Sequence, residues 1–272
     1  MEGELFELEL LGGFTEKRYR MMRPEVEAMP WDTLDPSLYE ERDLVLARKA
    51  WTGAAFQEHR TGIACCSTLR ALIECRAPLD LVAVASRFPL DEMVHVELCA
   101  RMAMALGGGT EIVHDPLKLA MDADPKWSPI VRAADLVARF FCVGETLSIP
   151  LLRGTWKAAR HPLSKAILGR IVKDEAAHGT FGWTFMDWAL PQLSDDDKVL
   201  VAKRADLAIK AISRQWKALR DKPKAKNAEA HPLGWMETEP YLALAERSMQ
   251  TLVVDRFRTR GFPVTWPVPG RG

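Results

Sequence analysis

A short pattern occurs twice in this chain and constrains its fold more than any other feature. Asp91-Glu92-Met93-Val94-His95 and Asp174-Glu175-Ala176-Ala177-His178 each place an acid and a glutamate before two apolar residues and a histidine. On an α-helix, side chains three positions apart project from the same face, so each glutamate and histidine form a pair one turn apart. Carboxylate and imidazole groups at this spacing are typical metal ligands when helices face each other. The repeat therefore predicts two helices that meet across a metal site.

The hydrophobic spacing and the positions of Gly and Pro predict six helices. Their approximate ranges are 38–75, 80–106, 128–160, 162–190, 194–219 and 240–260. Pro89 and Pro150 fall inside the second and third helices, where the missing N–H should kink the chain. No stretch has a convincing strand pattern. The expected fold is all-α, with two antiparallel helical hairpins that form a four-helix bundle.

Three segments follow from this pattern. Residues 1–37 contain scattered Gly, Pro and aromatic residues and should form an irregular arm over the core. Residues 38–190 supply the metal-binding bundle. Residues 191–272 form a helical extension and tail packed on the bundle, interrupted by a charged, solvated linker at about 221–226.

Two further carboxylates can be located by counting from the turns. Residues at equal distances from a hairpin turn lie at the same level in an antiparallel helix pair. The turn near Pro78 lies 14 residues before the first glutamate of the repeat, and Glu58 is the only acid near the matching level. The turn near His161 lies 14 residues before the second, and Glu145 lies near its matching level. We therefore expect a ligand set of Glu58, Glu92, His95, Glu145, Glu175 and His178.

A third glutamate–histidine pair at the same spacing is a chance match. Glu111 and His114 lie between three glycines and Pro116, with no amphipathic helix to carry them. The alternative for the other glutamates is a solvated, salt-bridged surface. Their apolar neighbours oppose it, because a carboxylate on such a face is costly to bury unless it is paired or bound to a metal.

Composition excludes several functions. Lys plus Arg and Asp plus Glu both number 37 in the 272 residues, so nothing favours nucleic acid or an anionic membrane. No apolar run approaches a membrane span, and the first residues lack the pattern of a secretory signal. The five cysteines form no CxxC pair, which indicates reduced thiols and no built-in rubredoxin-type centre. We expect a cytoplasmic protein.

With these ligands the chain resembles the ferritin-like di-iron carboxylate superfamily over roughly residues 40–190. The resemblance implies a ferritin-like four-helix bundle that holds two iron ions, with manganese as a possible substitute. It implies a non-haem di-iron oxidoreductase that reduces O2 to a peroxo intermediate and oxidises a small organic substrate. The Asp-Glu-x-x-His form is most similar to bacterial multicomponent monooxygenases and acyl-carrier desaturases.

Residues around the ligands have expected roles as well. A metal-bound histidine usually donates its second ring N–H to a carboxylate, so Asp91 should lie near His178 and Asp174 near His95. Small or apolar residues on the ligand-bearing faces could line a substrate or O2 pocket, with close helix packing or plain core as the alternative. These pocket candidates are Gly62, Cys99, Phe141, Cys142, Gly179 and Gly182.

Other functions stay open at this point. The sequence carries no flavin or nicotinamide fingerprint, so electrons should come from a ferredoxin, a reductase or the substrate itself. A homodimer is compatible with the chain. The alternatives to an oxygenase or oxidase are a ferroxidase or iron-storage protein, a manganese catalase-like peroxide scavenger, and a helical scaffold without activity.

Overall fold

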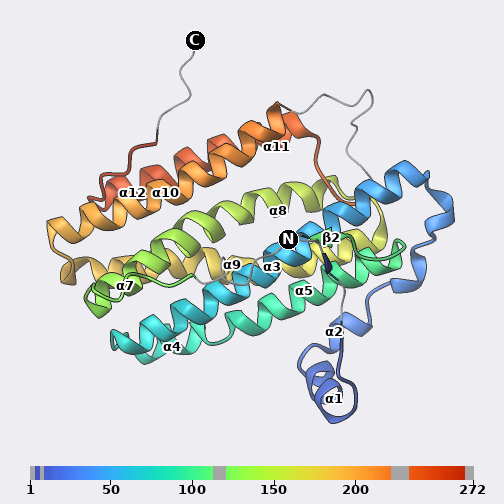
Figure 1. Ribbon diagram of the computed structural model, residues 1–272, viewed down its shortest axis with the longest axis horizontal. Helices are drawn as coiled ribbons and strands as arrows, with labels where there is room; N and C mark the ends of the chain where they lie inside the picture. The colour runs from blue at the N-terminus through green and yellow to red at the C-terminus, as the bar shows by residue number, and fades with distance from the viewer. Residues whose placement is uncertain (1–3, 7–8, 113–120, 222–232, 267–272) are drawn as a thin grey trace.

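The computed structural model describes residues 4–6, 9–112, 121–221 and 233–266, and it is helical almost throughout (Figure 1). The expected all-α class is confirmed. In the part of the chain that is described, no helix is long and apolar enough to span a membrane.

The first hairpin consists of α3 (Glu41–Glu74), α4 (Leu79–Ala85) and α5 (Phe88–Ala105). α3 and α5 lie side by side along most of their length (Figure 1). The sequence predicted one helix kinked at Pro89, and this is wrong, because the chain breaks into two helices there. Pro89 lies in the first turn of α5, where its missing N–H costs nothing and its fixed φ favours a helix start.

α5 ends where the sequence predicted, at the three glycines. Gly107 and Gly108 adopt φ of 117° and 113°, a region that favours glycine, and the Gly108 N–H donates to the Ala103 carbonyl at 3.2 Å. The chain then forms β2 (Glu111–Ile112), which pairs antiparallel with β1 (Glu4–Leu5). Strands of two residues are too short to leave a period-2 pattern, so the hydrophobic spacing did not predict them.

The second hairpin begins with α7 (Pro129–Leu136), continues through a π-helix, η3 (Val137–Glu145), into α8 (Thr146–Ala158), and returns as α9 (Pro162–Ala189). A single α-helix was expected from 128 to 160. The π-helical turns leave some carbonyls without their usual partner, and the Thr146 hydroxyl donates to the Phe141 carbonyl at 3.0 Å.

The C-terminal helices cover the second hairpin rather than the first (Figure 1). α10 (Asp195–Arg220) contacts η3, and α11 (Thr238–Ser248) contacts α8. A second π-helix, η5 (Met249–Val254), and α12 (Asp255–Thr259) complete the extension, so the helix expected over 240–260 is present with a π-helical centre. A 3-10 turn, η4 (Leu190–Gln192), connects α9 to α10. Beyond Asp221, the expected linker lies outside the described residues.

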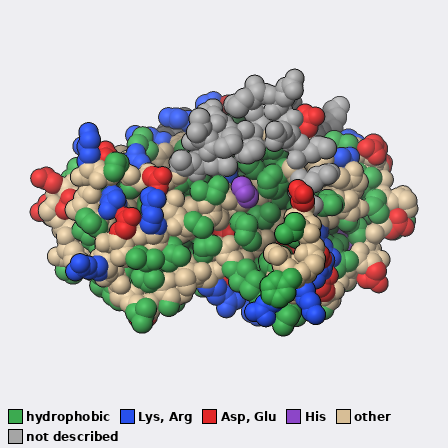
Figure 2. Space-filling model, turned by 60° about the horizontal axis from the view of Figure 1, so that its bottom comes forward, with side chains coloured by type: hydrophobic (Ala, Val, Ile, Leu, Met, Phe, Trp, Pro, Cys, Tyr) green, Lys and Arg blue, Asp and Glu red, His purple; other side chains and the backbone are tan. Residues whose placement is uncertain are grey.

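The N-terminal arm contains α1 (Gly13–Met22), α2 (Pro24–Glu27) and two 3-10 turns, η1 (Trp31–Thr33) and η2 (Pro36–Leu38). α1 projects from the body and buries none of its residues (Figure 1). Its Phe14 is 80% exposed. Figure 2 shows hydrophobic and basic side chains next to each other on one face of the molecule. Arg23 attaches the arm to the body, because it is fully buried and pairs with buried Glu97 on α5 at 2.7 Å.

Candidate metal centre

The six expected ligands converge at the centre of the two hairpins. Glu58 lies on α3, Glu92 and His95 on α5, Glu145 at the end of η3, and Glu175 and His178 on α9. Their ligand atoms form two overlapping groups, each with all its atoms within 4.8 Å of one another. One group is Glu58, Glu92, His95 and Glu175; the other is Glu92, Glu145, Glu175 and His178. Glu92 and Glu175 belong to both.

Both imidazoles turn Nδ1 toward the carboxylates. His95 Nδ1 lies 3.3 Å from Glu175 and 3.6 Å from Glu92. His178 Nδ1 lies 3.1 Å from Glu92 and 3.5 Å from Glu175. The two glutamates of the repeat therefore lie between the two histidines, so they are positioned to bridge two cations.

The inward-facing atoms of this cluster lack hydrogen-bond partners. Both carboxylate oxygens of Glu92, one of Glu175 and the Nδ1 atoms of His95 and His178 are buried without one. An unpaired buried polar atom costs on the order of 1–3 kcal/mol, and a charged one costs more. Several such atoms at one point are explained if they are ligands, and the carboxylate and imidazole donors suit a divalent transition metal. The residues therefore fit a metal pair.

The negative charges of the buried carboxylates repel one another, and the pKa values of two of them show this repulsion. Burial, followed by repulsion from Glu92 and Glu175, raises the pKa of Glu58 well above its usual value. Burial, followed by repulsion from the same two residues, does the same to the pKa of Glu145. The shift favours the protonated form of both carboxyls, and a bound cation would oppose it.

The pKa values of the two histidines are raised as well, which favours their positively charged form. Burial alone would lower the pKa of His178, but the nearby carboxylates of Asp91, Glu175 and Glu92 outweigh it and raise the pKa to about 12. Burial would also lower the pKa of His95, and the nearby carboxylates of Glu175 and Glu92 raise it well above its usual value. Without metal, protons on these rings balance the buried carboxylates.

The aspartates lie behind the histidines in a crossed arrangement. Asp174 Oδ2 lies 3.1 Å from His95 Nε2, within hydrogen-bond distance. Asp91 Oδ2 lies 3.6 Å from His178 Nε2, which is an ion-pair contact rather than a hydrogen bond. Arg170 pairs with Asp174, and the Arg87 Nε donates to Asp91 at 3.2 Å. Each aspartate therefore joins the repeat on one hairpin to the histidine on the other.

Two neighbours of the cluster were not identified from the sequence. The Phe88 ring packs on His178 with 4.2 Å between ring centroids and shields it from solvent. Cys65 is buried close enough that burial, and then the charges of Glu92 and Glu145, raise the pKa of its thiol. Phe88 lies one turn before Glu92 on α5, and Cys65 lies two turns after Glu58 on α3, so the spacing of both residues from a ligand could have identified them.

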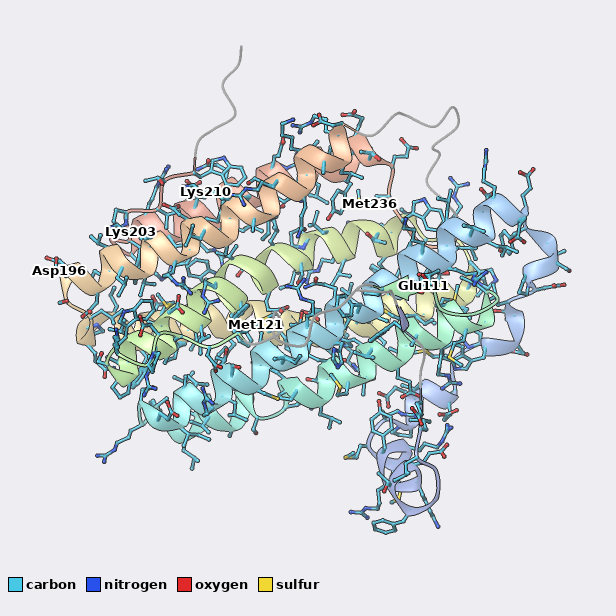
Figure 3. All side chains as sticks on the ribbon, viewed as in Figure 1. Glu111, Met121, Asp196, Lys203, Lys210 and Met236 are labelled. Atoms are coloured by element: carbon cyan, nitrogen blue, oxygen red, sulfur yellow. The ribbon has the colours of Figure 1, made fainter. Side chains whose placement is uncertain are left out.

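A cavity of about 470 Å3 opens onto one side of the cluster. Glu58, Glu145 and Glu175 form its floor. The walls come from α3, η3, α8, α10 and α11. Met121, which is labelled in Figure 3, contributes from the segment before α7. The other lining residues are Ala54, Gln57, Arg60, Thr61, Ala64, Phe140, Gly144, Leu147, Ser148, Leu151, Leu152, Thr155, Ile212, Gln215, Trp216 and Tyr241.

The six pocket candidates lie elsewhere, because none of them lines this cavity. A Cβ at Gly62 would lie 2.6 Å from Met93 Cε, and one at Gly182 would lie 2.8 Å from Phe141 Cβ. These glycines, and Gly179 beside Ile149, permit close helix packing, which was the stated alternative. The remaining candidates, Cys99, Phe141 and Cys142, are buried core residues.

The sequence did not identify the walls supplied by the C-terminal extension. Trp216 on α10 and Tyr241 on α11 line the cavity, although they lie far along the chain from every ligand. Glu111, the chance match, is exposed on β2 (Figure 3), and His114 lies outside the described residues.

Comparison with known proteins does not assign a family. The sequence matches no protein-family model, and no curated protein matches it. The buried carboxylate and histidine cluster is therefore the main guide to function.

Proposed function

We propose that this protein is a non-haem di-iron oxidoreductase that uses O2 to oxidise a small organic substrate. In this proposal α3, α5, the η3–α8 run and α9 form a ferritin-like four-helix bundle. Glu58, Glu92, His95, Glu145, Glu175 and His178 hold two iron ions, with Glu92 and Glu175 shared between them. Bound ferrous iron would pass electrons from a donor to O2 and would offer open coordination positions for O2 chemistry.

The observation that carries the proposal is the cavity that ends on the cluster. Its wall is largely apolar, and its acidic lining residues are the three cluster members Glu58, Glu145 and Glu175. A channel for iron uptake would instead carry acidic residues along its length. Tryptophan, phenylalanine and leucine next to a metal pair favour an organic substrate that displaces water from its binding site.

The residues of the chain have defined tasks in such a reaction. Asp174 accepts a hydrogen bond from His95 Nε2, which fixes the ring so that Nδ1 faces inward. Phe88 keeps solvent away from the second histidine. Glu58 and Glu145 are 14% and 8% exposed at the cavity floor, so they can change position or exchange protons when a substrate binds.

The reaction also sets a requirement for a partner. Inserting one atom of O2 into a C–H bond gives an alcohol and one water, and it consumes two electrons and two protons. Among the described residues the five cysteines are free thiols without a second redox centre. We propose that a separate ferredoxin or reductase supplies the electrons and that the protein works in the cytoplasm.

Anaerobic loading with ferrous iron followed by exposure to O2 tests the proposal. We expect about two irons per chain, rapid O2 consumption, and no further iron uptake afterwards. The variant E111Q is a matched control, since it removes the chance match and should bind iron normally. Failure to bind two metals, or no reaction of the ferrous protein with O2, would reject the proposal. Continued iron uptake would identify a ferroxidase, and activity restricted to manganese and peroxide would identify a catalase.

A further inference from the structure

The cavity beside the metal cluster has two charged poles of opposite sign. Its floor is formed by the carboxylates of Glu58, Glu145 and Glu175. Of the described residues that line it, Arg60 is the only lysine or arginine. The rest of the lining consists of apolar side chains and neutral hydrogen-bonding groups such as Gln57 and Thr61. A ligand that fills the cavity therefore needs apolar surface for most of its length and one group that can pair with Arg60.

The position of Arg60 on α3 separates it from the metal ligands. Residues two apart on an α-helix do not face each other, so Arg60 and Glu58 reach the cavity from opposite edges of α3.

Arg60 also has no ion-pair partner among the described residues, whereas many other arginines do. Arg23, Arg139 and Arg170 each contact a carboxylate at close range. Arg60 is only partly exposed and borders the cavity. Its five N–H donors form a fork that matches a carboxylate in two parallel hydrogen bonds. An unpaired guanidinium at the edge of an apolar cavity is thus available to a ligand.

The apolar lining extends along the helices. From the end of η3 through α8 the lining runs from Glu145 to Thr155, a span of ten residues or about 15 Å of helix. On α3 it runs from Ala54 to Ala64, an equal length. The cavity therefore fits an elongated molecule better than a compact one.

We infer that the substrate is an elongated monocarboxylate, with its carboxylate on Arg60 and its hydrocarbon chain on the apolar wall beside the metal ligands. One negative charge matches the one guanidinium. The carboxylate lies at the edge of α3 that carries Arg60, and Glu58 of the floor lies at the opposite edge of this helix. This inference rests on the proposed function for the reaction, but the binding itself depends only on the cavity.

Calorimetric titration of the full-length protein with decanoate and decan-1-ol tests this inference. We expect decanoate to bind more tightly than the alcohol. R60Q should weaken decanoate binding by about tenfold or more and leave decanol binding unchanged, because it removes only a charged hydrogen-bonding group. R60K should keep part of the preference. R153Q is the matched control, since Arg153 is an exposed arginine of α8 that does not line the cavity.

A second variant tests the cavity without changing charge. A54F should fill part of the apolar wall and weaken both ligands together. Equal affinities for decanoate and decanol in the unmodified protein, or unchanged decanoate binding in R60Q, would overturn the inference. Measuring iron content in the same samples separates it from the proposed function. A protein that binds two irons and reacts with O2 without preferring decanoate contradicts only the inference. A protein that prefers decanoate but binds no iron contradicts only the proposed function.

Discussion

The two helical hairpins supply the same kinds of ligand but surround them differently. Each contributes one glutamate from its first helix and a glutamate–histidine pair from its second. The first hairpin delivers Glu58 from an uninterrupted α-helix, whereas the second delivers Glu145 from the end of a π-helix. The C-terminal helices pack on the second hairpin, and with α3 they close the cavity. The repeated residues therefore build the candidate metal site, and the unrepeated surroundings form a cavity on one side of it.

The hydrogen bonding behind the histidines differs in the same way. His95, on the first hairpin, is held by Asp174 at 3.1 Å, and Arg170 supports that aspartate. His178, on the second, has Asp91 at 3.6 Å and is covered by the Phe88 ring. The histidine on the first hairpin is therefore fixed more firmly than its counterpart.

The largest effect should come from the glutamates that both halves share. E92Q or E175Q should reduce metal content from about two ions per chain to below one, because each oxygen pair serves both groups. E58Q and E145Q should each leave about one ion, since each residue belongs to one group only. Elemental analysis of the purified variants measures this. Equal losses of metal in all four variants would show that the two ligand groups do not bind separate ions.

Metal affinity should depend steeply on pH. The pKa values of Glu58, Glu145, His95 and His178 are raised in the metal-free site, so these groups hold protons that a metal must displace. Affinity should therefore rise with pH, by at least about tenfold per unit around neutrality, and fall in acid. Competition with a chromophoric chelator between pH 6 and pH 8 checks the slope. A flat profile would show that the buried groups are not the ligands.

Replacing each aspartate behind a histidine should lower metal affinity by a different amount on the two hairpins. D174N should lower metal affinity by about 10–100-fold, because it removes the hydrogen-bonded carboxylate that orients His95. D91N should have the smaller effect, because its contact to His178 is longer. Isothermal titration with ferrous iron under anaerobic conditions compares the two variants. A larger loss in D91N would reverse this ranking of the two hairpins.

The smallest effects concern the glycines that allow the helices to approach. G182A should destabilise the protein by about 1–3 kcal/mol, because its Cβ would lie 3.0 Å from the backbone nitrogen of Cys142, which cannot move cheaply. G62A should be close to neutral, because its neighbour is the flexible end of Met93 and alanine favours the helix. Urea unfolding measures both. Similar losses would indicate that the two hairpins are equally tightly packed.

Much of this arrangement could be read from the sequence because it depends on local rules. Helical periodicity and capping residues gave the helices, and a pair spaced by three residues on each of two helices fixed the faces that meet. Counting from the turns located Glu58 and Glu145, and the structure brings both to the cluster. The crossed positions of Asp91 and Asp174 followed from the symmetry of the repeat.

The remainder depends on contacts between distant segments. The π-helix at Val137–Glu145 is irregular backbone within a sequence that suits an ordinary helix. Trp216 and Tyr241 reach the cavity because the extension folds back over the second hairpin, and no spacing rule predicts that. The glycines were ambiguous for the same reason, since only the facing helix decides whether a missing side chain leaves a space or a contact.

The most direct test of the metal pair is a crystal structure of the iron-loaded protein with anomalous data collected at the iron edge. The account predicts two anomalous peaks per chain, about 3.5–4 Å apart, on either side of Glu92 and Glu175. A single peak, or peaks only on the protein surface, would contradict it.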